Sequence, residues 1–190
     1  MPRWEPDARE RLVAAALHLF TERGYDNTTV AQIVARAGLT KSTFFRHFPD
    51  KREVLAAGQE TMARLLAEGV AAAPDDAAPL DAVAAGLQRV ADAMTPFNRE
   101  LAPRLRAVIA TSAELQERDQ LKQVGLAAAL TAALRARGVP DPTATLAGEL
   151  GILAFKDAYA TWAAPDGDED LAVLCRTALT RLRTALTTLA

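Results

Sequence analysis

Between residues 28 and 48 the sequence carries two helix-start signals eleven residues apart, with a glycine between them. Thr29-x-x-Gln32 is a capping box, which predicts a helix start, and Gly38 is the residue type that most often ends a helix. Thr40 is a favourable N-cap for the next helix. Two short helices joined by a tight turn form a helix-turn-helix, so this segment constrains the fold more than any other.

Similar helix-start signals occur elsewhere in the sequence. Asp7-x-x-Glu10 predicts an earlier helix, and Asp50-x-x-Glu53 predicts a fourth helix that runs through Leu66. Alanine, leucine and arginine dominate, whereas alternating apolar and polar patterns are scarce. The sequence therefore predicts an all-α protein of about nine helices. The last five are expected at 80–94, 98–110, 113–137, 143–164 and 168–189.

Composition places the chain among ordinary globular proteins, because 50% of its 190 residues are hydrophobic and 24% are charged. The single Cys175 excludes a disulfide within one chain and favours a reducing compartment. The first seven residues lack the apolar run of a signal peptide, and no apolar stretch is long enough to span a bilayer. We therefore expect a soluble, cytoplasmic protein that does not associate with membranes.

Charge is unevenly distributed along the chain. Residues 1–55 hold nine basic and seven acidic residues, a net +2, whereas residues 56–190 hold thirteen basic and seventeen acidic residues, a net −4. Five basic residues and one acid, Asp50, lie between Arg36 and Arg52. A positive segment of this kind suits a polyanion such as DNA, although charge alone favours a solvated helix face.

A longer pattern extends over residues 9–55. It comprises Ala16, Leu19-Phe20, Gly24-Tyr25, Thr28-Thr29-Val30, Ile33, Ala37-Gly38-Leu39-Thr40-Lys41, Thr43, His47-Phe48 and Lys51. With these residues the segment resembles the DNA-binding domain of the tetracycline-repressor (TetR) family. The rest of the chain is similar to that family in length and helix count only. The resemblance implies a helix-turn-helix domain of three helices at residues 1–55 and a helical domain for ligand binding and dimerisation at 56–190.

The resemblance also implies which residues contact the sugar-phosphate backbone of DNA. Thr28 and Thr29, at a helix start, are expected to hydrogen-bond a phosphate. His47 and Lys51 are expected to hold phosphates on the far side of the motif, with Lys51 beside the start of the fourth helix. Contacts of this kind position the protein without specifying a base sequence.

Base readout is expected from the second helix of the motif, whose N-terminal residues enter the major groove. Lys41, Ser42 and Thr43 are expected to reach bases or nearby phosphates, and Arg46 can pair with a guanine edge. Phe45 stands where the family usually has tyrosine, so a phosphate contact through a hydroxyl is lost. Apolar contact with a thymine methyl or a sugar is the expected substitute.

The two final helices are expected to form a homodimer. Gly148 and Gly151 would let another helix approach closely, and the last helix carries a broad apolar stripe. Both features also occur in an intramolecular core, which is the alternative, but recognition of palindromic DNA favours a dimer. The stripe consists of Leu171, Leu174, Cys175, Ala178, Leu182, Ala185, Leu186 and Leu189.

A regulatory pocket for a largely apolar small molecule is expected among bulky residues of the C-terminal part. Asp157 continues an apolar stripe, so it either receives a cationic ligand or pairs with an arginine across the dimer interface. The other candidate pocket residues are Met62, Met94, Phe97, Phe155, Tyr159 and Trp162, which are also typical core residues.

These observations favour a transcriptional regulator, most simply a dimeric repressor that leaves a palindromic operator when a small molecule binds. A ligand-independent architectural or developmental DNA-binding protein of the same fold is the alternative, and activation in place of repression remains open. An enzyme is disfavoured, because the only histidines are His18 and His47 and the sequence has no metal-ligand cluster, phosphate-binding loop or nucleophile elbow. We expect no catalytic residues, cofactor or metal.

Overall fold

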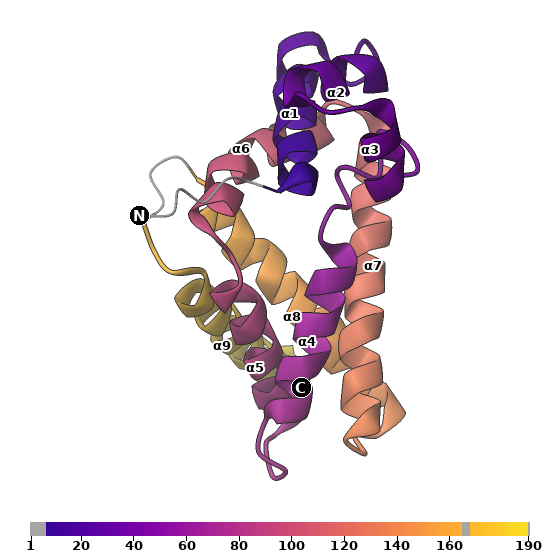
Figure 1. Ribbon diagram of the computed structural model, residues 1–190. Coiled ribbons are helices and arrows are strands. Elements are labelled where there is room, and N and C mark those ends of the chain that lie inside the picture. Colours follow the sequence, from indigo (N-terminus) through magenta and orange to yellow (C-terminus); the bar gives the residue numbers. More distant parts are fainter. Residues whose placement is uncertain (1–6, 165–167, 190) are drawn as a thin grey trace, which may run out of the picture. The chain divides into compact units, whose positions relative to one another are not determined.

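The computed structural model describes residues 7–164 and 168–189, and these residues form nine α-helices without a β-strand (Figure 1). The all-α prediction is therefore confirmed. Among these residues, no helix combines the length with the apolar character that a membrane-spanning segment needs. The helices are α1 (Ala8–Arg23), α2 (Val30–Ala37), α3 (Lys41–His47), α4 (Gln59–Ala72), α5 (Pro79–Asp92), α6 (Pro96–Ala110), α7 (Ala113–Ala136), α8 (Asp141–Trp162) and α9 (Leu171–Leu189).

The chain divides into two compact units. Unit 1 comprises the residues up to Ala57 together with Leu101–Leu121, and unit 2 comprises Gly58–Glu100 with the residues from Lys122 onward. Helices α6 and α7 thus each contribute to both units. The first part of unit 1 ends close to the domain boundary expected at residue 55, and a later segment of the chain completes the unit. The assignment of 56–190 to ligand binding and dimerisation stays a prediction.

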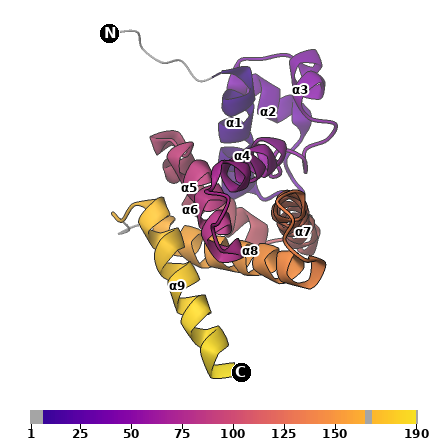
Figure 2. The same cartoon turned by 90° about the horizontal axis from the view of Figure 1, so that it is seen from below.

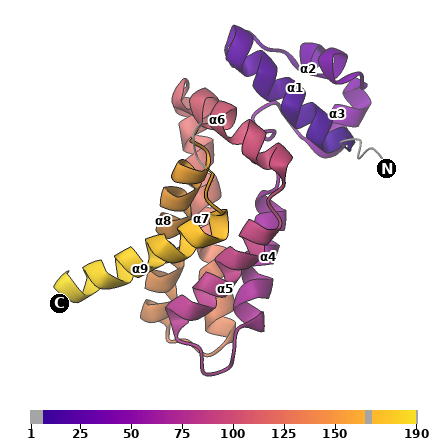
Figure 3. The same ribbon diagram turned by 90° about the vertical axis from the view of Figure 1, so that its left-hand side faces the viewer.

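The helix-turn-helix forms where its local signals predict it (Figure 3). Thr29 and Gln32 make both hydrogen bonds of a capping box at the start of α2. Gly38 ends α2 in the left-handed backbone conformation, with φ 64°, which residues other than glycine rarely adopt. Thr40 then caps α3 by accepting a hydrogen bond from the backbone N–H of Thr43.

The fourth helix begins later than the sequence predicts. Asp50 Oδ1 accepts hydrogen bonds from the backbone N–H groups of Arg52 at 2.8 Å and Glu53 at 3.2 Å, as a helix cap would. Those bonds instead stabilise a series of turns, and α4 starts only after Gly58, whose φ is 87°. The expected helix running on from Asp50 is therefore wrong.

Unit 1 is organised around a core to which all three N-terminal helices contribute. Leu12 of α1, Ile33 of α2 and Phe44 of α3 are fully buried. Arg104 of α6 bonds the His18 ring of α1, and Arg118 of α7 holds Glu53 through two contacts of 2.8 Å. The same guanidinium lowers the pKa of the Glu53 carboxyl, so this pair is charged at neutral pH.

In unit 2 the close approach of helices occurs within one chain. A Cβ atom on Gly69 of α4 would lie 2.5 Å from a backbone oxygen of α5, so these helices touch backbone to backbone. Gly148 faces Thr131 of α7, and Gly151 faces Val83 of α5. The expectation that Gly148 and Gly151 admit a partner subunit's helix is therefore wrong, because helices of the same chain occupy both positions.

The two halves of α9 have different surroundings. Leu171, Cys175 and Leu179 are buried in unit 2, so the first half of the predicted stripe is intramolecular core. The second half extends beyond the other helices of this unit, where Leu182 and Leu186 are half-buried (Figures 2 and 3). The second half therefore leaves apolar surface for another molecule, whereas in the first half Val173 is an exposed large apolar side chain, at 44%.

Candidate nucleic-acid interface

Helix α3 has one buried face and one open face. Phe44 and the C-cap residue Phe48 are 0% and 2% exposed, and these two rings anchor the helix in unit 1. Lys41, Ser42 and Arg46 are exposed on the rest of the helix. Because the aromatic anchors immobilise the backbone of α3, the exposed side chains are presented from a rigid element.

The start of α3 favours an anion. Its first turn holds no acidic residue, so no side chain offsets the partial positive charge of the helix N-terminus. The Thr40 and Thr43 hydroxyls lie 3.0 Å apart, and the Thr40 hydroxyl also accepts the Thr43 N–H at 3.1 Å. Thr43 is consequently half-buried and held in one place, whereas Lys41 and Ser42 beside it are exposed.

Phe45 is the most exposed large apolar side chain of the helix-turn-helix, with 56% of its surface exposed. It follows Lys41 by four residues and Ser42 by three, so the three share one face of α3. An aromatic ring beside polar groups can contact apolar atoms of a ligand but cannot donate a hydrogen bond to a phosphate.

The two threonines expected to bind phosphate occupy different environments. Thr29 is exposed at the start of α2, where its backbone N–H donates to Gln32 Oε1 at 2.8 Å. Thr28 is only 1% exposed, and its hydroxyl donates to the carbonyl oxygen of Gly24 at 2.9 Å. The Thr28 side chain is therefore part of the turn between α1 and α2 and not of the open surface.

His47 and Lys51 are also less accessible than their expected role requires. His47 is half-buried, and its Nε2 atom is enclosed without a hydrogen-bond partner among the described residues. The Nζ atom of Lys51 donates to the carbonyl oxygens of Tyr25 at 2.8 Å and Thr28 at 3.1 Å. The structure thus exposes Thr29, Lys41, Ser42, Phe45 and Arg46, and it buries Thr28. Thr43, His47 and Lys51 are half-buried.

Sequence reasoning missed two contacts that brace this motif. Arg11 of α1 donates to the carbonyl oxygen of Ala37, the last residue of α2. The guanidinium of Arg9 lies 5.5 Å from the ring centroid of Phe48. Their only signal in the sequence is a basic residue on the first helix, which does not reveal a partner more than 25 residues away.

The candidate pocket residues all lie in unit 2, and three of them form a cluster of rings. The Phe155 and Tyr159 centroids are 5.7 Å apart, and those of Tyr159 and Trp162 are 5.5 Å apart. The guanidinium of Arg99 lies 5.6 Å from the Trp162 centroid. Three further candidates are half-buried, namely Met62, Met94 and Phe97.

Asp157 stands apart from these rings. Its side chain is 53% exposed and pairs with Arg181 of its own chain at 3.1 Å. The expectation of an arginine partner is met within the chain and not across an interface, and an exposed, paired carboxylate is poorly placed to receive a cationic ligand.

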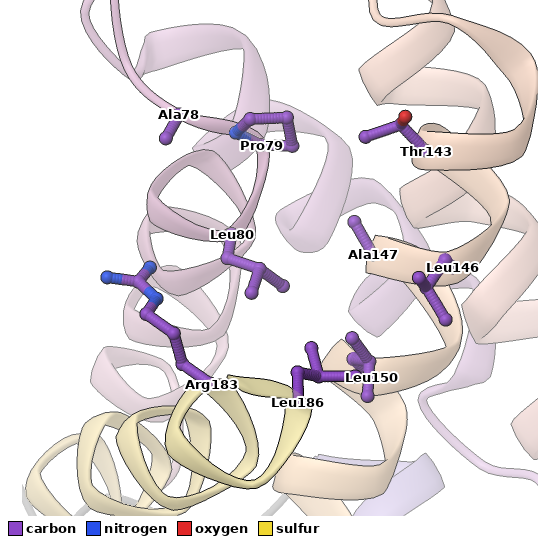
Figure 4. A pocket seen from close by; sticks show the side chains of 9 residues that line it. All are labelled: Ala78, Pro79, Leu80, Thr143, Leu146, Ala147, Leu150, Arg183 and Leu186. Atoms are coloured by element: carbon purple, nitrogen blue, oxygen red, sulfur yellow. The ribbon is translucent and has the colours of Figure 1, made fainter. Parts of the chain in front are cut away.

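An open apolar groove lies where α5, α8 and α9 meet (Figure 4). Its volume is about 440 Å³, and the side chains of Leu80, Leu146, Leu150 and Leu186 surround it. Arg183 lies at its edge and bonds Asp81 at 2.7 Å. None of the residues expected to bind an effector lines this groove.

Known proteins share the pattern of unit 1. The family model "Bacterial regulatory proteins, tetR family" matches residues 12–57. The regulator Rv2250c of Mycobacterium tuberculosis is 30% identical over 140 residues, which cover 70% of each chain. The chain belongs to the TetR family. The relatives that it matches are named as HTH-type transcriptional regulators, the class of protein that the sequence favours.

Similarity beyond the helix-turn-helix is weaker. The regulator TcmR of Streptomyces glaucescens is 48% identical over 46 residues, which are 24% of this chain and 20% of TcmR. The first relatives are matched over only about a fifth to a quarter of their own length. The triclosan complex of SmeT, the repressor of a Stenotrophomonas maltophilia efflux pump, has a TM-score of 0.57 at 23% identity and covers 92% of this chain and 90% of SmeT. That likeness extends the family fold over both units.

Proposed function

We propose that this TetR-family protein is a repressor that binds a palindromic operator as a homodimer and leaves it when a small, largely apolar molecule binds unit 2. The observation that carries DNA binding is α3, whose exposed Lys41, Ser42, Phe45 and Arg46 surround a helix start free of acidic residues. Thr29 adds a phosphate contact at the start of α2. Successive major grooves on one side of B-DNA are about 34–36 Å apart, which sets the spacing required of two α3 helices.

A mobility-shift assay with the DNA upstream of the protein's own coding region tests operator binding. We expect a palindromic footprint that weakens at high salt, because phosphate contacts release counterions. The double variant Lys41→Ala/Thr43→Ala should lose the shift, whereas Arg89→Ala, which removes an exposed cation of α5, should keep it. Equal binding by the double variant and the wild type would refute the assignment of α3 to the groove.

The homodimer is supported by apolar surface on unit 2. Leu146 and Leu153 of α8 are 54% and 50% exposed, and Leu150 between them is half-buried. This row adjoins the groove of Figure 4, and the projecting half of α9 adds Leu186. An uncovered apolar surface of this kind is costly in water, and α8 and α9 of a second copy would bury it in a four-helix interface.

Sedimentation equilibrium at micromolar concentration tests the dimer. We expect a dimer for the wild type and a monomer for Leu153→Glu, because the interface would have to bury two unpaired carboxylates. Val124 of α7 is 64% exposed and lies outside this surface, so Val124→Glu is the matched control and should remain a dimer. Dimers of equal strength from both variants would exclude the α8–α9 surface as the interface.

An apolar effector is supported by the ring cluster of Phe155, Tyr159 and Trp162 in unit 2. SmeT, which shares the fold, forms a complex with triclosan. A ligand that binds one conformation of the dimer more tightly shifts the population toward it, and operator affinity falls if the α3 helices then no longer match successive grooves. Helices α6 and α7 each continue from one unit into the other, so they offer a covalent path for this change.

Triclosan is the first probe of this step. It should raise the midpoint of thermal unfolding and weaken the operator shift, and Tyr159→Ala should reduce both effects. Glu60→Ala, which removes an exposed carboxylate of α4, serves as the control variant. A panel of lipophilic compounds that alters neither stability nor operator affinity would favour the ligand-independent alternative.

A further inference from the structure

Arg9 lies in the first turn of α1, where its side chain is half-buried. Its guanidinium lies 5.5 Å from the centroid of the Phe48 ring, and that ring is 2% exposed. Among the residues that the structure describes, the guanidinium has no hydrogen-bond acceptor and no carboxylate partner. A guanidinium has five N–H donors, so none of the five is used within this part of the chain.

Two carboxylates close to Arg9 in the sequence do not neutralise its charge. Asp7 caps α1, because its side chain accepts the backbone N–H of Glu10 at 2.9 Å. Glu10 is half-buried, and its Oε2 atom is enclosed without a partner. Both acids belong to the described residues, and neither forms an ion pair with Arg9. A cation in the first turn also opposes the partial positive charge of the helix N-terminus, so the stability of α1 does not account for Arg9.

Phe48 places Arg9 at the C-terminal end of α3. Phe48 is the C-cap residue of that helix, and the first turn of α1 lies beside α3 (Figures 1 and 3). Lys41 is exposed at the opposite end of the same helix. A helix of seven residues is about 10 Å long, close to the width of about 12 Å of the major groove. A cation at each end of α3 is therefore placed to meet the phosphates that border a groove holding this helix.

Protection of the Phe48 ring is the other explanation of the contact. The stem of an arginine can cover an apolar surface while its charged head stays in water. A role of that kind needs only the stem, and an uncharged side chain of similar length would serve as well. A phosphate contact needs the charge. The two explanations therefore predict different results when the charge alone is removed.

We propose that Arg9 neutralises a phosphate of the operator at the C-terminal end of α3. This inference rests on the proposed operator binding. Cation–π attraction holds the guanidinium over Phe48 before DNA arrives, so the side chain loses little freedom when the contact forms. The planar fork of N–H groups can donate two parallel hydrogen bonds to one phosphate. Such a contact positions α3 in the groove and carries no information on base sequence.

The salt dependence of DNA binding by full-length Arg9→Met tests this role. Methionine keeps an apolar stem beside the ring and removes the charge. The slope of log K against log salt should become shallower by about 1.8, which is about 0.9 for each of two phosphates in a dimer. Between about 50 and 200 mM salt, the variant should therefore lose about twelvefold less affinity than the wild type loses. The midpoint of thermal unfolding should fall by at most about 4 °C, because a partly exposed cation–π contact is weak.

Arg36→Met is the matched control. Arg36 of α2 lies in the same unit and carries the same charge, but Glu22 pairs with it at 2.9 Å. This control should keep the wild-type slope. Arg9→Lys should also keep the slope, with lower affinity, because an ammonium cannot donate two parallel bonds to a phosphate. Arg9→Gln removes the charge but keeps a polar side chain, and it should match the slope of Arg9→Met.

Three results would overturn the inference. A wild-type slope in both Arg9→Met and Arg9→Gln would mean that Arg9 only covers Phe48. Equal changes of slope in Arg9→Met and Arg36→Met would mean a general loss of positive charge in place of a contact. If neither Arg9→Met nor Arg9→Gln folds, Arg9 serves the core of unit 1.

Failure of the proposed function would give a different pattern. If the wild type binds the upstream DNA no better than an unrelated duplex, the proposed operator binding fails. The same slopes can then be measured on the unrelated duplex at low salt, because phosphate contacts supply nonspecific binding. A shallower slope in Arg9→Met would still support the phosphate contact of Arg9, and a wild-type slope would still overturn it.

Discussion

Replacing Phe45 with alanine is the most informative single change in the helix-turn-helix. With 56% of its surface exposed, a side chain of about 200 Å² offers about 110 Å² to a partner. Complete burial of that area would contribute at most ~2.8 kcal/mol per subunit at about 25 cal/mol per Å². A thymine methyl covers only part of the ring and contributes about 0.8 kcal/mol, the value for one buried methylene.

The assay compares one upstream DNA fragment made with thymidine and the same fragment made with deoxyuridine, which lacks the 5-methyl group. With one methyl contact in each half-site, the wild type should lose ~1.6 kcal/mol, or about fifteenfold in affinity, on the uracil fragment. Phe45→Ala should bind thymidine DNA more weakly than the wild type and lose nothing further on uracil DNA. This double-mutant cycle isolates the contact between ring and methyl.

Two results would refute the reasoning. An equal loss by wild type and Phe45→Ala on uracil DNA would mean that other residues read the methyl groups. Unchanged affinity of Phe45→Ala for thymidine DNA would mean that the exposed ring lies outside the interface. Phe45→Tyr is the control that keeps the ring area, and it should retain most of the sensitivity to uracil.

Three further predictions concern stability, each measured by urea unfolding. At pH 7, Arg118→Met should lower the free energy of unfolding by about 1–2 kcal/mol, because the Glu53 carboxylate loses a bidentate partner. Arg118 lowers the pKa of the Glu53 carboxyl below its usual 4.5. The stabilisation by this pair is therefore complete above pH 4.5 and disappears as the pH falls through the lowered pKa. An equal difference in unfolding free energy between wild type and Arg118→Met at pH 7 and at pH 3 would contradict this reasoning. Gly69→Ala should cost about 1–3 kcal/mol, because its Cβ would meet backbone, whereas Gly125→Ala meets only a flexible glutamine side chain and should cost much less. Thr40→Ala should cost about 1 kcal/mol, and a neutral result would mean that its cap does not stabilise α3.

Short-range signals predicted the helix-turn-helix correctly. The capping box of Thr29, the stop at Gly38 and the cap at Thr40 each involve partners within four residues. Such bonds depend on local backbone geometry and form in almost any tertiary context. The family resemblance agreed with them over the same segment, and the family model matches there.

The fourth helix shows where a local signal is ambiguous. Asp50 makes the predicted bonds to the backbone N–H groups of Arg52 and Glu53, yet the chain continues as turns. The same side-chain bonds begin either a helix or a turn, since both present free N–H groups in succession. Gly58 was the residue that could have signalled the later start. It adopts a positive φ, which interrupts a helix, and α4 begins at the next residue, Gln59.

Functional side chains were harder to assign than helices. Thr28 and Lys51 match the family pattern in the sequence as well as Lys41 does, yet only Lys41 is exposed. Likewise the spacing of Gly148 and Gly151 fits a dimer interface, but helices of the same chain already pack closely against both glycines. Nothing in the neighbouring residues distinguishes these cases, because each depends on segments far along the chain.

The amino-acid sequence by itself determined the helical class, the helix-turn-helix and the family, because each follows from side-chain spacing and from bonds between residues a few positions apart. Only the tertiary structure decided which of the matching side chains remain free to meet another molecule. A half-buried lysine whose ammonium bonds two carbonyls and lies over a ring differs from an exposed lysine through contacts across 23 or more residues. Such contacts exist only after the chain has folded.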